Sequence, residues 1–219
     1  MMLNRVTMMH NGIEVDVTRA LPAMDKTVAR SRINEANLHA ASSDMVVAKP
    51  KAAKWYCLQV MTGREFSVEK QLDDANIEHV SPRERVVFVK RGRKIDGERL
   101  FFPGYILVHC RPSAEAFHGL RRIRNVIDIV GNGGRYHVVS EKDVNVFKDM
   151  AAVAVPRVAT DKTLVEGDTA SITFGPFKGF DCIILALKWS REARARVQLS
   201  VFGKDFEIES MPLAFLKKL

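Results

Sequence analysis

The pattern of hydrophobic and polar positions changes twice along the chain. Residues 1–50 mix small, polar and charged side chains without a sustained apolar period, although a transient helix over 29–41 could form with little to pack against. From Trp55 apolar residues recur at strand and helix spacings, and after Thr163 only strand spacings remain. The sequence therefore predicts a flexible N-terminal extension (1–50), a mixed domain (51–150), a linker (151–163) and a small β domain (164–219).

Alternating strands and helices are predicted for the mixed domain. WYCLQVM at its start alternates, with Tyr56, Leu58 and Val60 on one face, as in a half-buried strand. Thr62 and Glu65 form a capping-box pattern for a helix that ends at Asn76. The later elements are strands over 85–90 and 100–109 around a hairpin excursion, a helix capped by Ser113, the strand VIDIVG, and a helix opened by Ser140 and Asp143 with Val144, Phe147 and Ala151 inward. A compact α+β sandwich follows, and a ferredoxin-like arrangement is one such fold.

The last 56 residues read as short strands broken by turns. TASITF, CIILALK, ARVQLSVF and DFEIES are rich in strand formers, and GPFKGF suits a turn between the first two. This spacing predicts a small antiparallel β-barrel, joined to the mixed domain by a flexible linker. A domain of this size is near the lower limit for independent folding, so marginal stability is expected.

Composition narrows the class of protein. With 47% hydrophobic residues the chain can build a core, and 34 Lys and Arg against 26 Asp and Glu give a net charge of +8. That charge favours nucleic acid or acidic surfaces as partners. The sequence contains no apolar run long enough for a membrane helix and no secretory signal, so we expect a cytoplasmic protein that does not bind membranes. Cys57, Cys110 and Cys182 are expected to be buried thiols.

A search for catalytic patterns points away from an enzyme. The six histidines have no metal-ligand spacing, and no glycine loop is followed by a phosphate-binding lysine. The carboxylates are scattered among basic residues, so no catalytic pair can be named. We expect no catalysis, no cofactor and no metal.

Two groups of side chains could bind a partner. LFFPGYILV places Phe101, Phe102 and Tyr105 around a Pro-Gly break, which is consistent either with core packing or with an aromatic anchor for a partner helix. A second group, Arg121, Arg122 and Arg124, ends a predicted helix. These cations could complement the helix dipole or contact phosphates.

The order of five segments resembles one known family. KWYCLQVMTGREFSVEKQL, GERLFFPGYILV, IVGNGG, GDTASITFGPFKGF and VQLSVFGKDFEIE follow one another as in bacterial NusG transcription factors. The resemblance covers Lys54 to Leu219. It implies a NusG-type domain, a flexible linker and a C-terminal KOW barrel in a monomeric transcription elongation factor without catalytic activity.

The resemblance also implies three binding surfaces. A hydrophobic depression would hold the clamp helices of the RNA polymerase β′ subunit and suppress pausing, through Tyr56, Gln59, Gln71, Phe101, Phe102, Tyr105 and Leu107. The non-template DNA strand would pass Arg121, Arg122 and Arg124. The KOW domain would recruit the termination factor Rho or a small-subunit ribosomal protein through Phe202, Gly203 and Lys204.

Departures from the family pattern point to a specialised member. Cys182 stands where housekeeping members have a glycine, and the strand after it is unusually apolar, as in the operon-restricted paralogue RfaH. We therefore expect a paralogue that acts on a subset of genes. A general NusG that recruits Rho and the ribosome is the alternative, and a ribosome-associated RNA-binding protein is a more remote one. Refolding of the KOW domain into a helical hairpin, as RfaH allows, also stays open.

Overall fold

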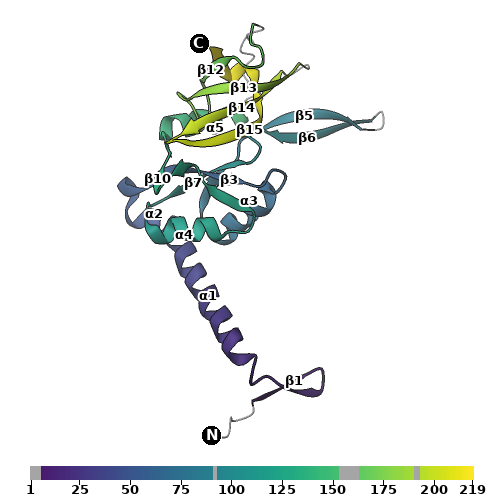
Figure 1. The fold of residues 1–219 in the computed structure, drawn as a ribbon, viewed down its shortest axis with the longest axis vertical. Helices are drawn as coiled ribbons and strands as arrows, with labels where there is room; N and C mark the ends of the chain where they lie inside the picture. Colours follow the sequence, from purple (N-terminus) through teal and green to yellow (C-terminus); the bar gives the residue numbers. More distant parts are fainter. Residues whose placement is uncertain (1–5, 91–92, 153–162, 190–192) are drawn as a thin grey trace.

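The computed structural model describes residues 6–90, 93–152, 163–189 and 193–219. A mixed α/β domain occupies the middle of the molecule (Figure 1). The C-terminal strands pack on one side of this domain, and an N-terminal arm projects from the other side (Figure 1). Among the described residues, no helix combines the length and the apolar character that crossing a membrane requires.

The mixed domain is built on a five-stranded antiparallel sheet. Strands β3 (Lys54–Val60) and β7 (Tyr105–Cys110) pair at its centre. Strand β4 (Glu78–Val80) extends the sheet beyond β7, whereas β8 (Val126–Ile129) and β11 (Val138–Val139) share the other edge of β3. The register pairs Cys57 with Leu107 and Gln59 with Tyr105, so that these residues lie on one face of the sheet.

Helices cover the opposite face. Helices α3 (Glu65–Asp74) and α4 (Ala114–Arg122) pack their apolar sides against the residues that alternate with Cys57 and Gln59. The resulting core contains Tyr56, Leu58, Val60, Val68, Leu72, Ile106, Val108, Ala116 and Leu120. The predicted alternation of the first strand is confirmed, because Tyr56, Leu58 and Val60 all belong to this core.

Two of the three predicted helix caps are confirmed. The Ser113 hydroxyl accepts a hydrogen bond from the Ala116 amide at 3.1 Å, and the Ser140 hydroxyl accepts one from the Asp143 amide at 3.2 Å at the start of α5 (Glu141–Ala152). The Thr62 cap is wrong, because α3 begins after Arg64 without a side-chain cap. Glu65 instead accepts a hydrogen bond from the Gly104 amide at 2.9 Å and so ties the helix to the turn before β7.

The region 83–104 differs from its predicted form. Strands β5 (Arg83–Lys90) and β6 (Arg93–Leu100) pair as a long hairpin that projects from the body (Figure 1), so most of the predicted excursion is itself a strand. The predicted strand 100–109 starts only at Tyr105, because Pro103 and Gly104 form a turn in which Gly104 adopts a φ of +84°. Two short strands, β9 (Gly131–Asn132) and β10 (Arg135–Tyr136), form a second hairpin.

The C-terminal module (163–189 and 193–219) is a five-stranded antiparallel sheet. Its strands are β12 (Thr169–Ile172), β13 (Asp181–Lys188), β14 (Arg194–Val201), β15 (Lys204–Pro212) and β16 (Leu216–Lys218), in the order β15-β14-β13-β12-β16. A 3₁₀ turn, η2 (Leu213–Phe215), precedes β16. The GPFKGF segment is a turn, as predicted. The α+β class is confirmed, and the described form of the module is the strand form.

An N-terminal arm contains more structure than the sequence predicts. A hairpin of β1 (Thr7–His10) and β2 (Ile13–Asp16) leads into the 19-residue helix α1 (Leu21–His39), followed by α2 (Ser43–Ala48) and η1 (Pro50–Ala52). The expectation that a helix here has little to pack against is wrong. Its last turns pack on α4, where the Asn37 amide lies 3.1 Å from His118 Nδ1, and Ala41 joins the domain core.

Gly119 allows α1 to approach α4 closely, which makes it a sensitive position. A Cβ atom there would lie 2.6 Å from the backbone of Asn37 and Leu38. Gly119→Ala should therefore displace the end of α1, although alanine favours the helix itself by about 1 kcal/mol. We expect faster amide hydrogen exchange in α1 with unchanged protection in β3 and β7. Unchanged exchange in α1 would contradict this packing.

Two predicted features lie wholly or partly outside the described residues. Residues 153–162, which make up most of the predicted linker, are not described. The side chain of Ala151, predicted to point inward, is not described either.

Candidate functional site

The sheet face opposite α3 and α4 is aromatic and is covered by the C-terminal module. Phe101, Phe102 and Tyr105 are each at most 5% exposed. The Phe102 ring centroid lies 5.9 Å from that of Phe215 and 6.3 Å from that of Phe177, both in the module. Helix α5 completes the cluster, because Phe147 lies 5.3 Å from Phe102. One hydrophobic core thus runs across both parts of the chain.

Tyr105 is fixed by a polar contact as well as by packing. Its hydroxyl donates a hydrogen bond to the Glu207 carbonyl at 2.7 Å, and its ring meets Phe177 edge-on at 5.1 Å. Burial raises the pKa of this phenol well above its usual value, with a smaller contribution from nearby acidic groups. Tyr105 is therefore a neutral donor across the contact.

The predicted polymerase-binding residues divide between the two sheet faces. Phe101, Phe102, Tyr105, Leu107 and Gln59 lie on the covered aromatic face. Tyr56 lies on the helical face, where its ring meets Phe117 edge-on at 5.0 Å and burial raises its pKa to about 12. Gln71, on α3, hydrogen-bonds to the backbone of Arg124 through both ends of its amide. The structure thus brings five of the seven together and places two elsewhere.

A buried arginine joins the module to the mixed domain. Arg194, on β14, is 7% exposed, and its Nη1 lies 2.6 Å from Glu84 Oε1 at the start of the β5–β6 hairpin. Its Nη2 donates to the carbonyls of Leu100 and Phe101 at 3.2 Å, and its Nε donates to the Ser210 hydroxyl at 2.7 Å. The guanidinium therefore satisfies acceptors on both sides of the contact.

Sequence reasoning missed Arg194 because it sits in a run of similar charged residues, SREARARVQL. Strand alternation gives no signal either, since Arg194 shares a face of β14 with Arg196, which is exposed. Burial lowers the pKa of the Arg194 guanidinium, helped by Arg99, whereas Glu84 opposes the shift. The charge is retained because an arginine stays protonated in proteins.

A second set of contacts ties the β14–β15 turn to the mixed domain. Asp128, in β8, pairs with Arg121 of α4 at 2.9 Å and with Lys204 of the module at 2.7 Å. Desolvation raises the pKa of Asp128, but the hydrogen bonds from Lys204 and the Ile129 amide and the charge of Arg121 outweigh it and hold the pKa below its usual range. Asp128 thus bridges two of the predicted binding sets.

The predicted partner-binding residues of the module lie in this same turn. Phe202 and Gly203 both adopt positive φ, and Phe202 is 44% exposed. The Phe202 carbonyl accepts a hydrogen bond from the Asn132 side chain at 3.0 Å, and Arg135 lies over its ring at 5.4 Å. Side chains on β9 and β10 therefore hold the turn against the mixed domain.

The three arginines of the predicted nucleic-acid set have different surroundings. Arg121 is paired with Asp128 and lies over the Tyr136 ring at 5.3 Å. Arg124 exchanges backbone hydrogen bonds with Gln71. Arg122 is exposed and has no ion-pair partner within the part of the chain that the structure describes.

The described residues offer little that could carry catalysis. They contain no group of three His, Cys, Asp or Glu side chains placed to hold a metal ion. All three cysteines are buried free thiols, as expected, and burial raises the pKa of Cys110 to about 12 and that of Cys182 to about 11. These thiols are therefore unreactive at neutral pH.

Comparison with known proteins points to one family. Residues 53–148 match the family model described as transcription termination factor nusG. This part of the chain is therefore similar to the NusG family. The Escherichia coli K12 transcription termination/antitermination protein NusG is 28% identical over 167 residues, covering 71% of this chain and 91% of that protein. The protein of the same name from Buchnera aphidicola of Baizongia pistaciae is 29% identical with the same coverage.

Among solved structures, one reported as domain interaction in Thermotoga maritima NusG covers 76% of this chain and 97% of its own, at 22% identity and a TM-score of 0.37. The NusG match starts at residue 53, so the arm helix α1 precedes the matched domain, whereas the aromatic face lies within it.

Proposed function

We propose that this NusG-family protein is a transcription elongation factor that binds the β′ clamp helices of RNA polymerase, suppresses pausing and links transcription to termination or antitermination partners. The observation that carries the proposal is the aromatic face of the NusG domain, formed by Phe101, Phe102, Tyr105 and Leu107. Aromatic side chains clustered in one patch are typical anchors for a partner helix.

In the described form this face is not accessible to polymerase. The C-terminal module buries Phe102 and Tyr105, and Arg194 fills the polar edge of the contact. Polymerase and the module would therefore compete for one surface. Polymerase binding would require the module to separate, and separation would also free Phe202, Gly203 and Lys204 for Rho or a ribosomal protein.

This competition links the first binding event to the second. Only open molecules, in which the module has separated from the aromatic face, can bind polymerase. The apparent affinity for polymerase is therefore the affinity of the open form multiplied by the fraction of molecules that are open. Once open, the module is held near the polymerase by the chain, which raises its effective concentration for a second partner. The factor would thus recruit its second partner mainly where it is already bound to polymerase.

We further propose that the protein acts on a subset of genes. The closed contact supports this because a factor whose polymerase surface is covered needs an additional signal to engage. As a factor that binds RNA polymerase, the protein would act in the cytoplasm. Mapping a tagged copy and polymerase along the genome by crosslinking tests this: enrichment on a few operons is expected. A profile that matches polymerase on all genes would indicate a general NusG.

Arg122 provides a test of the nucleic-acid contact. It is an exposed cation that ends α4, so reversal should leave the closed contact intact. Arg122→Glu should weaken binding to a single-stranded non-template segment and lower the slope of log affinity against log salt by about 1. Lys188→Glu, on the exposed end of β13, is the matched control. Equal effects of the two changes would remove Arg122 from the DNA contact.

A further inference from the structure

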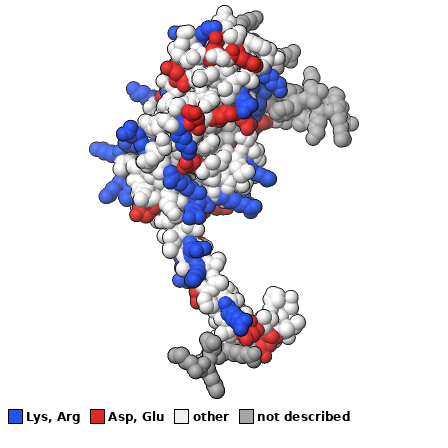
Figure 2. Space-filling view, viewed as in Figure 1, with Lys and Arg blue, Asp and Glu red and all other residues white. Residues whose placement is uncertain are grey.

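A stripe of side chains along helix α1 of the N-terminal arm is apolar and largely exposed in its N-terminal half. Helix α1 contains no buried residue, and Met24 and Val28 are 48% and 49% exposed. The stripe has the alternating three- and four-residue spacing of a helix seam, the line along which two paired helices meet. It consists of Leu21, Met24, Val28, Ser31, Glu35 and Leu38. Figure 1 shows this helix standing clear of the body, and Figure 2 shows uncharged surface between its charged side chains.

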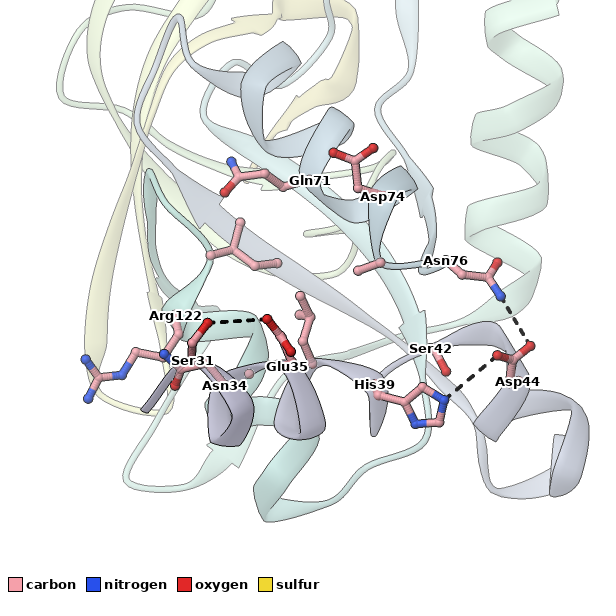
Figure 3. A pocket seen from close by; sticks show the side chains of 14 residues that line it. Ser31, Asn34, Glu35, His39, Ser42, Asp44, Gln71, Asp74, Asn76 and Arg122 are labelled. Carbon is pink, nitrogen blue, oxygen red and sulfur yellow. Dashed lines mark hydrogen bonds and ion pairs between the residues drawn. The ribbon is translucent and has the colours of Figure 1, made fainter. Parts of the chain in front are cut away.

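The C-terminal end of the stripe opens into a groove. A cavity of about 550 Å³ lies between α1, α3 and α4 (Figure 3). Its apolar lining comes from Leu38, Ala75 and Ile123, and Ser31 and Glu35 of the stripe line it as well. The seam is thus open toward the N-terminus of α1 and forms one wall of a groove toward its C-terminus.

We propose that the protein forms a homodimer through antiparallel pairing of two α1 helices. In this alignment Leu21 faces Leu38 of the second copy, Met24 faces its Glu35, and Val28 faces its Ser31. The free N-terminal half of each stripe then enters the groove of the other copy. The arrangement is two-fold symmetric and closed, so it yields a dimer rather than a filament.

Charge complementarity selects the second copy as the occupant. Asp25 and Arg32 each follow a seam residue and lie seven residues apart, too far for a direct ion pair within one helix. Neither has an ion-pair partner among the described residues. The antiparallel alignment places Asp25 of each copy beside Arg32 of the other, and symmetry makes this pair twice. A parallel alignment would instead place Asp25 near Ala20 and Arg32 near Thr27 of the other copy, so neither charge would be paired.

The outer side of the pair is suited to water. Lys26 and Arg30 lie on the side of α1 opposite the seam and are exposed. The pairing uses neither the aromatic face nor the β14–β15 turn, so it leaves the proposed polymerase contact free. It does overlap the proposed nucleic-acid contact, because Arg122 lines the groove.

Sedimentation of the full chain tests the proposal. We expect a mass of twice 24.6 kDa that dissociates on dilution. Val28→Glu should abolish the dimer, whereas Lys26→Glu, on the outer side, should leave it. Far-UV circular dichroism checks that both variants fold. A wild-type chain that stays monomeric up to several hundred micromolar would overturn the proposal.

A charge swap tests the alignment itself. Asp25→Arg and Arg32→Asp should each weaken the dimer about tenfold, because each replaces two attractions by two repulsions. The double variant should recover wild-type dimerisation. Failure of the double variant to recover, with both single variants weakened, would contradict the antiparallel register.

Cysteine crosslinking provides a second readout of orientation. Under mild oxidation an equimolar mixture of Met24→Cys and Glu35→Cys chains should form a covalent dimer of the two variants. Met24→Cys alone should not crosslink, since antiparallel pairing separates the two copies of this position by eleven residues, about 16 Å, along the helix axis. A strong crosslink from Met24→Cys alone would indicate parallel pairing and overturn the proposal.

Discussion

Arg194→Ala is expected to open the contact between the C-terminal module and the mixed domain. The change removes five hydrogen bonds of the guanidinium and leaves the carbonyls of Leu100 and Phe101 without this donor. Removing one member of a buried pair costs about 3–5 kcal/mol, and Arg99 Nε, 2.7 Å from Glu84, reduces this to about 2–4 kcal/mol. The apparent affinity for polymerase should rise at least about tenfold if the closed form predominates.

Arg196→Ala is the matched control for this prediction. Arg196 lies two residues further along β14, is exposed, and pairs with Glu207 inside the module. Its removal should leave both the closed contact and polymerase binding close to wild type. Binding of polymerase core enzyme to a labelled chain measures both variants. Equal affinities for Arg194→Ala and wild type would mean that Arg194 does not hold the surface closed.

Gly175→Ala is expected to open the same contact from the aromatic side. A Cβ atom at this position would lie 2.4 Å from Cζ of Phe102, so the ring or the module must move. Overpacking of this kind costs about 1–3 kcal/mol. Phe102 itself is unchanged, so its surface stays intact for polymerase. We therefore expect stronger polymerase binding and greater exposure of Phe102.

Gly179→Ala separates this clash from backbone strain. Gly179 has a φ of +85°, close to the +88° of Gly175, but a Cβ atom there would meet nothing within 4 Å. Both variants should therefore lose similar stability within the module through strain. Only Gly175→Ala should shift the equilibrium between closed and open forms, measured by the distance between labels on the two parts. A similar shift in both variants would assign the effect to strain.

Periodicity predicted the elements of the mixed domain because each strand and helix has one buried side. The alternation of Tyr56, Leu58 and Val60 and the caps at Ser113 and Ser140 depend only on neighbouring residues. The Thr62 cap failed because Gly104, 39 residues from Glu65, supplies the competing partner for that side chain. Local patterns cannot reveal a partner that the fold brings from far along the chain.

The same limit explains the covered aromatic face. The sequence indicated that Phe102 and Tyr105 could be either core or anchor residues, and in the closed form they pack as core residues. Their cover comes from Phe177, Phe215 and Glu207, more than 70 residues away. The length of α1 was missed because the helical spacing of Leu21, Met24 and Val28 continues through the polar residues Ser31 and Glu35, so the apolar period is not sustained.

The distance between the C-terminal module and the mixed domain during polymerase binding tests the central claim most directly. Labels on the exposed sites Lys70 of α3 and Lys188 of β13 report this distance by energy transfer in the full chain. Competition for the aromatic face predicts that saturating polymerase core enzyme lowers the transfer in wild type as Arg194→Ala does without polymerase. Tight polymerase binding with unchanged transfer would contradict the account, because the aromatic face would still be covered.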